Sequence, residues 1–262
     1  MKVNTMLGIR GTTLRVLPLL SALLLSGPCA FADGEHAPAT SAAHIPRVAL
    51  GHAGDFVILT EAGITDVPSS VITGKVGTSP ITGAANLLTC AEVTGKVLSV
   101  DAAGPLPCSI MKPAKLTVAV NDMQTAYTDA AGRAPTTLNL GGGEIGGLTL
   151  RPGVYNWTTG VDIGSDLKLK GRPGGVWIFQ INGDLNVAGG ASVLMSRLAQ
   201  TRNVFWQITG QATLGTSAHL EGIVLSKTQV VMGTNASLTG RLYAQTAATL
   251  QMNTITAPTN PK

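Results

Sequence analysis

The sequence predicts an all-β dominated fold, a β-solenoid accompanied by one long α-helix. The main observation is an internal repeat, in which residues 215–222 match residues 233–240 at a spacing of 18. Gly, Thr, Ala, Leu and Gly recur at the same places in both segments. A period near 18 with alternating apolar residues is typical of a β-helix turn made of three short strands. The 32 glycines and the charged content of only 12% agree with a turn-rich β protein.

The first strand of each repeat has large apolar residues at successive positions. Residues 177–183 align with residues 204–210 after an insertion. Successive side chains of a strand point to opposite faces, so an inward Trp206 leaves Phe205 pointing outward. Tyr243 occupies an outward position in a later repeat. An exposed row of this kind needs a cover.

One long α-helix is expected over residues 113–131. Proline suits the first helical position, and Gly132 suits the end of the helix. The apolar residues that recur at three- and four-residue spacing are Leu116, Val120, Met123, Tyr127 and Ala130. This stripe must be buried, so we expect the helix to cover the outward row and to run parallel to the solenoid axis.

The first 32 residues have the pattern of a secretory signal peptide. Basic residues precede the apolar run 16–25, and Ala30-Phe31-Ala32 forms a small-x-small cleavage site. The run is short for a bilayer span, and Pro28 stands where a lipoprotein site at Cys29 needs a small residue. We therefore expect a secreted protein, extracellular or periplasmic, without a membrane partner.

The mature chain is expected to form one solenoid domain, residues 55–258. Residues 33–54 are polar and rich in small side chains, which predicts a flexible N-terminus, and residues 259–262 form a tail. Residues 86–111 interrupt the strand rhythm and contain Cys90 and Cys108. In an exported protein an isolated pair of cysteines is most simply a disulfide. Since the end of a β-helix exposes an unpaired edge, we interpret this segment as a capping loop.

The composition argues against a nucleic-acid or metal-binding function. The formal net charge is +4, but Lys2, Arg10 and Arg15 lie within the predicted signal. No Lys/Arg cluster is interleaved with aromatic residues. His36 and His44 have no cysteines or paired carboxylates at ligand spacing. Neither a metal nor any other cofactor is expected.

The second strand of each repeat predicts a flat and nearly uncharged surface. Its outward positions fall in ranks about 4.8 Å apart, and one rank holds Asn186, Thr213, Val231 and Thr249. Threonine offers a methyl and a hydroxyl group on a stiff side chain. A rigid, planar patch suits binding to a crystalline surface, where area accumulates from many weak contacts. Composition alone supports this interpretation and an ordinary exposed β-surface equally.

Catalytic groups are scarce. Carbohydrate-cleaving β-helices need carboxylates paired across neighbouring coils. The carboxylates Asp162, Asp166, Asp184 and Glu221 do not fall in one register of the repeat. Gly-x-Ser-x-Gly, His-Glu-x-x-His and phosphate-loop patterns are absent from the sequence. The protein is therefore not expected to be an enzyme.

Seven segments, taken in order, carry a resemblance to a known family. They are residues 56–59, 70–80, 122–131, 150–155, 176–181, 203–208 and 240–246. Together they are similar to the microbial ice-binding (antifreeze) proteins with a discontinuous β-solenoid. The resemblance implies a right-handed, triangular, parallel β-helix with a long helix on one face. It also implies that N-terminal coils are inserted beside the C-terminal ones.

The resemblance further implies adsorption to ice, thermal hysteresis and inhibition of ice recrystallisation. In the family, ice contacts the flat face that the helix leaves uncovered, sometimes through a Thr-Ala/Gly-x-Thr/Asn motif. Residues 246–249 match this motif in full, residues 209–212 match its first half, and residues 228–231 keep only its leading threonine. The ice-binding residues expected here are Asn186, Thr209, Gln211, Thr213, Thr228, Gln229, Val231, Thr246, Ala247 and Thr249. The expected partner is an ice crystal surface, met by a monomer.

Two other functions are compatible with a secreted β-solenoid. The first is an adhesin or surface module whose flat face binds a polysaccharide or a protein, and retention on a glycan array would favour it. The second is a polysaccharide-degrading enzyme, which the release of reducing ends from pectin or alginate would reveal. The scarcity of carboxylates argues against the second function.

Overall fold

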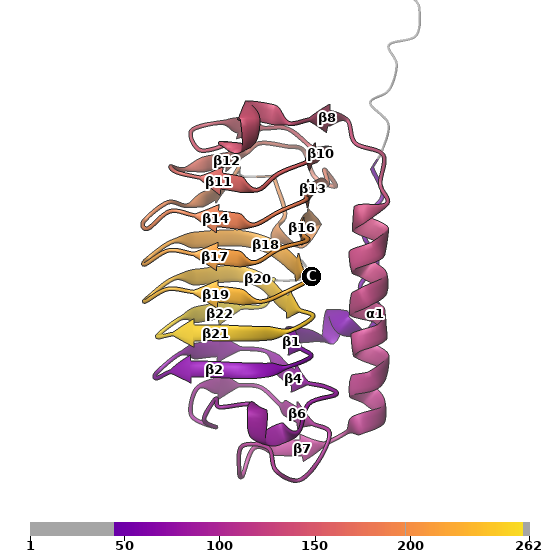
Figure 1. Ribbon diagram of the computed structural model, residues 1–262, viewed down its shortest axis with the longest axis vertical. Coiled ribbons are helices and arrows are strands. Elements are labelled where there is room, and N and C mark those ends of the chain that lie inside the picture. The colour runs from indigo at the N-terminus through magenta and orange to yellow at the C-terminus, as the bar shows by residue number, and fades with distance from the viewer. Residues whose placement is uncertain (1–44, 197, 259–262) are drawn as a thin grey trace, which may run out of the picture. The chain divides into compact units, whose positions relative to one another are not determined.

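The computed structural model describes residues 45–196 and 198–258. The predicted signal peptide and the C-terminal tail lie outside these residues, as do residues 33–44. The described chain winds as a parallel β-solenoid, and one α-helix, α1 (Pro113–Ala131), runs along its side (Figure 1). The fold class predicted from the repeat and the position of the helix are confirmed. Within the described ranges, no helix has both the length and the apolar character of a membrane span.

The solenoid has three faces, and the strands of the described residues pair in parallel. The helix face contains, in spatial order, β7 (Ser109–Met111), β6 (Val97–Ser99), β4 (Lys75–Thr78), β1 (Phe56–Thr60), β20 (Ser237–Ala244), β18 (His219–Ser226), β16 (Val204–Ile208), β13 (Trp177–Ile181), β10 (Gly153–Trp157) and β8 (Thr137–Leu138). The flat face contains β11 (Val161–Ile163), β14 (Leu185–Val187), β17 (Ala212–Leu214), β19 (Val230–Met232), β21 (Ala247–Gln251) and β2 (Gly63–Val67).

The third face is built from shorter strands and from parts of longer ones. Its separate strands are β9 (Thr149–Leu150), β12 (Leu167–Leu169), β15 (Val193–Met195), β22 (Thr254–Thr256), β3 (Val71–Thr73) and β5 (Val93–Thr94). The first halves of β18 and β20 also lie on it, because both strands run on from this face into the helix face. Gly222 and Gly240 are paired at this bend, and a Cβ on Gly240 would lie 1.7 Å from the Gly222 carbonyl oxygen. Only glycine fits where the two backbones approach so closely.

The coils do not follow one another in sequence order. Strand β1 pairs with β20, so that Ile58 lies beside Leu242, and β2 pairs with β21, so that Ile64 lies beside Ala248. Figure 1 shows the early strands β1 and β2 next to the late strand β21. The discontinuous order that the resemblance implied is therefore present, and the N-terminal coils extend the stack beyond β21.

The interior is filled by apolar side chains from equivalent positions of successive coils. Phe179 and Trp206 stack with ring centroids 4.0 Å apart and ring planes inclined by 14°. Both rings and those of Trp157 and Trp177 are buried. The indole of Trp206 donates its N–H to the Glu221 carbonyl oxygen at 2.9 Å, which satisfies its polar edge.

Helix α1 covers the outward row of the helix face. Its buried residues are Leu116, Ala119, Val120, Met123, Ala126 and Ala130. They pack in one apolar layer with Phe205, Ile223 and Tyr243, as the strand alternation predicted. Gln180 caps the C-terminal end of the helix, because its amide donates to the carbonyl oxygens of Ala130 at 2.8 Å and Ala131 at 3.2 Å. These carbonyls have no partner within the helix itself.

The chain just before β1 is ordered against the helix, in contrast to the flexible segment predicted for residues 33–54. Val48 and Ala53 are buried in the layer beneath α1, and residues Gly51–Asp55 form the short 3-10 helix η1. The backbone N–H and ring Nδ1 of His52 lie 2.6 and 2.9 Å from Asp122 Oδ2 on α1. In the sequence, Val48 and Ala53 stand among polar and small residues, so their burial was not predicted.

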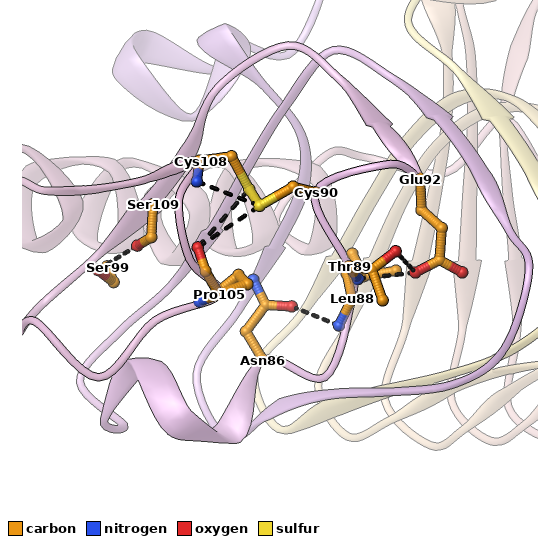
Figure 2. The surroundings of a disulfide bond; sticks show 9 residues. All are labelled: Asn86, Leu88, Thr89, Cys90, Glu92, Ser99, Pro105, Cys108 and Ser109. Atoms are coloured by element: carbon orange, nitrogen blue, oxygen red, sulfur yellow. Dashed lines mark hydrogen bonds between the residues drawn. A yellow bond between two sulfur atoms is a disulfide. The ribbon is translucent and has the colours of Figure 1, made fainter.

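The segment 86–111 closes one end of the stack. Cys90 and Cys108 form the predicted disulfide (Figure 2). The segment is more regular than expected, since β5, β6 and β7 continue two of the faces across it. The hydroxyl groups of Ser99 and Ser109 lie 2.7 Å apart and join its two sides. The remaining short 3-10 helices are η2 (Gly83–Ala85), η3 (Leu140–Gly143) and η4 (Thr201–Asn203).

An acidic pair lies beneath the last turn of the flat face. Asp66 is in register with the inward Leu250, and the Ser70 hydroxyl donates to Asp66 Oδ1 at 2.6 Å. Glu92 accepts the N–H groups of Ser70 at 2.8 Å and Thr89 at 2.7 Å. Burial first, and then the neighbouring Glu92, raise the pKa of Asp66 to about 6, although the hydrogen bond from Ser70 opposes this shift. Burial opposes ionisation of Glu92 too, but its donors outweigh burial and lower its pKa.

We expect the Cys90→Ser/Cys108→Ser variant to lose about 3 kcal/mol of unfolding free energy. The disulfide spans 18 residues, and its loss frees the unfolded chain to adopt more conformations. Urea unfolding measures the change, and the reduced wild-type protein should unfold at the same urea concentration as the variant. An unchanged midpoint would show that the cap does not limit stability.

We expect Asp66→Asn to stabilise the protein near pH 7.5 but not near pH 4. The folded-state pKa of about 6 exceeds the ordinary value of 3.8, so this carboxyl destabilises the fold increasingly as pH rises through 6. Allowing for solvent screening, the gain at the higher pH is about 1 kcal/mol. Urea unfolding at both pH values measures it. An equal effect of the substitution at both pH values would contradict this account.

Candidate functional site

The flat face presents one outward residue per strand in a continuous rank. Register places Asp162 beside Asn186, Asn186 beside Thr213, Thr213 beside Val231 and Val231 beside Thr249. Thr65 on β2 then continues the rank beyond Thr249. From Asp162 to Thr249 the residues on either side of each member are inward and buried, as in Leu185 and Val187. We call this line of six residues the central rank.

A second rank runs parallel to the first, two residues earlier on each strand. Its members are Asp184, Gln211, Gln229, Ala247 and Gly63. The two glutamines and Ala247 are half-buried, because side chains one strand apart cover each other at a spacing of about 4.8 Å. The two ranks together give a surface with few protruding groups.

Hydrogen bonds between neighbouring side chains hold the ranks in place. Gln229 Nε2 donates to Gln211 Oε1 at 2.5 Å, and Gln211 Nε2 donates to Thr213 Oγ1 at 2.8 Å. At the junction with the N-terminal coil, Thr65 Oγ1 donates to Thr249 Oγ1 at 3.1 Å. These bonds restrict the rotamers of side chains that would otherwise move freely, so little conformational freedom remains to be lost on binding.

The predicted threonines at the motif starts lie at the rim of the flat face. Thr209, Thr228 and Thr246 stand in the turns that lead from helix-face strands to flat-face strands. Thr246 donates its N–H to the Thr228 carbonyl oxygen at 3.3 Å, so these two are neighbours. Thr209 is instead aligned with Lys227, whose N–H donates to the carbonyl oxygen of Ile208. Thr209 is therefore offset by one residue from the line that contains Thr228 and Thr246.

Within the two ranks, charge is confined to one end of the flat face. Asp162 and Asp184 are exposed at the β11–β14 end, where Asn186 Nδ2 donates to Asp162 Oδ1 at 2.9 Å. Asp184 Oδ1 accepts the N–H of Gln211 at 2.7 Å. From β17 to β2 the outward residues of both ranks are uncharged, and Asp66 on β2 points inward. The face therefore has a neutral part that begins at β17 and ends at β2.

Thr65 is a member of the central rank that the sequence did not predict. The internal repeat aligns β17, β19 and β21, whereas β2 lies 184 residues before its partner position and shares no repeat with it. The sequence Gly63-Ile64-Thr65 predicted a strand, but nothing in it predicted which face or neighbour the strand would have. Among the described residues, no cluster of three or more His, Cys, Asp and Glu is arranged to hold a metal ion.

A family model described as Ice-binding-like matches residues 58–256. An ice-binding protein of Colwellia sp is 57% identical over 213 residues, which cover 81% of this chain and 84% of the relative. An ice-binding protein of Flavobacterium frigoris (strain PS1) is 52% identical over 227 residues, covering 86% of this chain and 82% of the relative.

Solved structures of similar proteins agree with these sequence matches. A glycosylated ice-binding protein from an Arctic yeast superimposes with a TM-score of 0.76 at 36% identity, over 82% of this chain and 96% of that protein. A domain of an ice-binding protein from Shewanella frigidimarina gives 0.72 at 26% identity, over 82% and 99%. The match of the family model, the relatives and the shared fold together show that this chain belongs to the ice-binding-like family.

Proposed function

We propose that this protein is an antifreeze protein that binds ice through the flat face, without any catalytic step. The observation that carries the proposal is the central rank, which repeats one outward position across six strands of a rigid sheet. Relatives that cover most of the chain bear the name ice-binding protein, and this supports ice as the ligand.

Adsorption to a crystal requires many weak contacts to form at once. Each contact adds little, so a surface that must reorganise loses most of the gain as entropy. Side-chain hydrogen bonds such as Gln211–Thr213 and Thr65–Thr249 hold the face in one arrangement. Threonine methyl and hydroxyl groups offer apolar and hydrogen-bonding contacts at fixed positions. Bound protein then blocks growth of the crystal, which produces thermal hysteresis and inhibits recrystallisation.

The proposed contact residues fall into three groups. The centre is Thr213, Val231 and Thr249, with Thr65 added by the N-terminal coil. The second rank supplies Gln211, Gln229 and Ala247, and Asn186 stands at the charged end. Thr209, Thr228 and Thr246 form the rim. All of these residues belong to one chain, so a monomer presents the whole surface, and the pattern of residues 1–32 supports a secreted protein.

We expect Thr213→Tyr and Thr249→Tyr each to remove most of the thermal hysteresis. A phenol ring would protrude from the flat surface and hold ice away from the rest of the rank. Both side chains point outward, so the unfolding free energy should change by less than about 0.5 kcal/mol. Nanolitre osmometry on the folded variants measures the freezing gap and the crystal shape.

The matched control is Thr239→Tyr, on a strand of the third face where Thr239 lies between Glu221 and Thr256. It adds the same ring to the same solenoid and should leave hysteresis unchanged. Full activity in both flat-face variants would remove this face as the contact surface. Full activity together with retention of the protein on a glycan array would favour a polysaccharide-binding module.

We expect Thr65→Tyr to reduce hysteresis as well, because Thr65 completes the neutral part of the central rank. Thr73→Tyr is its control, since Thr73 belongs to the next N-terminal strand, β3, on the third face. The same osmometry compares the two. If Thr65→Tyr behaves like its control, the contact surface ends at β21 and the N-terminal coil serves only the fold.

A further inference from the structure

A cationic pocket lies between the N-terminal segment and the helix face, away from every flat-face strand. It has a volume of about 460 Å³, and residues 47–51 with Gly54 form one wall. Arg47, Arg202 and Arg241 line it from three separate parts of the chain: the N-terminal segment, η4 and β20. We call this site the arginine pocket.

The three guanidinium groups have few partners. Among the described residues, none of them lies within 4.0 Å of a carboxylate oxygen, and Arg202 Nε is buried without a hydrogen-bond acceptor. Arg202 Nη2 donates to Gln200 Oε1 at 3.1 Å, and Arg241 Nη1 donates to the Phe56 carbonyl oxygen. Both acceptors are neutral, so they do not offset the charge.

The arginines also repel one another. Burial lowers the pKa of Arg47, and the charges of Arg202 and Arg241 lower it further. A guanidinium does not lose its proton in proteins, so the cluster must bear this repulsion. The carboxylate of Asp55 also lines the pocket, but its Oδ2 is already bound by Lys115 Nζ at 3.0 Å and Lys75 Nζ at 3.2 Å. These bonds lower the pKa of Asp55 and leave it little capacity to compensate the arginines.

We propose that the arginine pocket binds a multivalent oxyanion, namely a phosphate or sulfate group. Guanidinium groups present planar pairs of N–H donors that match the oxygen spacing of such anions. A dianion offsets more of the triple positive charge than a carboxylate does. The pocket is larger than a bare tetrahedral anion, so it also accepts a phosphate attached to a small alcohol.

The test uses the folded mature protein at constant ionic strength. Inorganic phosphate and glycerol phosphate are titrated in separate arms, with chloride as the monovalent comparison, and binding is followed by calorimetry and by the melting temperature. We expect saturable one-to-one binding of phosphate and a raised melting temperature, because a ligand that binds only the folded state stabilises it. Tighter binding of glycerol phosphate than of phosphate would identify an ester as the better ligand.

Arg47→Gln is the first variant, because Arg47 is the most exposed of the three arginines even though its side chain is partly buried. It should weaken phosphate binding about tenfold, since one of three charged contacts is lost. Arg202→Gln should weaken binding similarly. Arg172→Gln, an exposed arginine in the loop before β13, is the matched control and should bind like the wild type. Unsaturable binding, or equal affinity in Arg47→Gln, Arg202→Gln and the control, would overturn the proposal.

Ice shaping is measured on the same proteins and separates this site from the flat face. The arginine pocket predicts that Arg47→Gln keeps full hysteresis while it loses phosphate affinity. Phosphate binding in a protein that does not shape ice would leave the pocket supported and the ice-binding proposal refuted. Loss of both properties in Arg47→Gln would mean that the substitution disturbs the fold, and Arg202→Gln then decides the matter.

Discussion

The structure depends on in-register, parallel hydrogen bonding between coils. This pairing fixes the distance between equivalent residues at about 4.8 Å and leaves no freedom of register, because a slip of one residue would exchange inward and outward side chains. The stack of Phe179 on Trp206, the row under α1 and the central rank are three results of that single constraint. The same periodic strand pairing therefore builds both the core and the proposed contact surface.

A stack of parallel strands has two open edges, and here N-terminal strands pair with one of these edges. The N-terminal strands β1 and β2 cover the edges of β20 and β21, so the edge moves on to the segment 86–111. The strands of that segment are too short to cover the open edge. The Cys90–Cys108 disulfide holds the loops of the segment together. The burial of Val48 and Ala53 beneath α1 then fixes the whole N-terminal block against the helix.

The sequence predicts outward positions only for the strands that its internal repeat covers. The spacing of 18 residues links β17, β19 and β21, so the outward positions of Thr213, Val231 and Thr249 could be read directly. Thr65 could not be placed this way, because its pairing with β21 is long-range and follows no repeat. Nor could the bond from Gln180 to the end of α1 be foreseen, since it depends on where a buried amide meets another element.

The same long-range pairing determines how much neutral surface the flat face has. Charged carboxylates are costly to strip of water, so the exposed Asp162 and Asp184 disfavour contact with a crystal at the β11–β14 end. The uncharged outward residues belong to β17, β19 and β21, and β2 adds a fourth strand to this neutral part. Since adsorption accumulates over area, a coil that is inserted out of order enlarges the part of the face best suited to ice. Discontinuity in this fold thus contributes to the proposed function as well as to the closure of an edge.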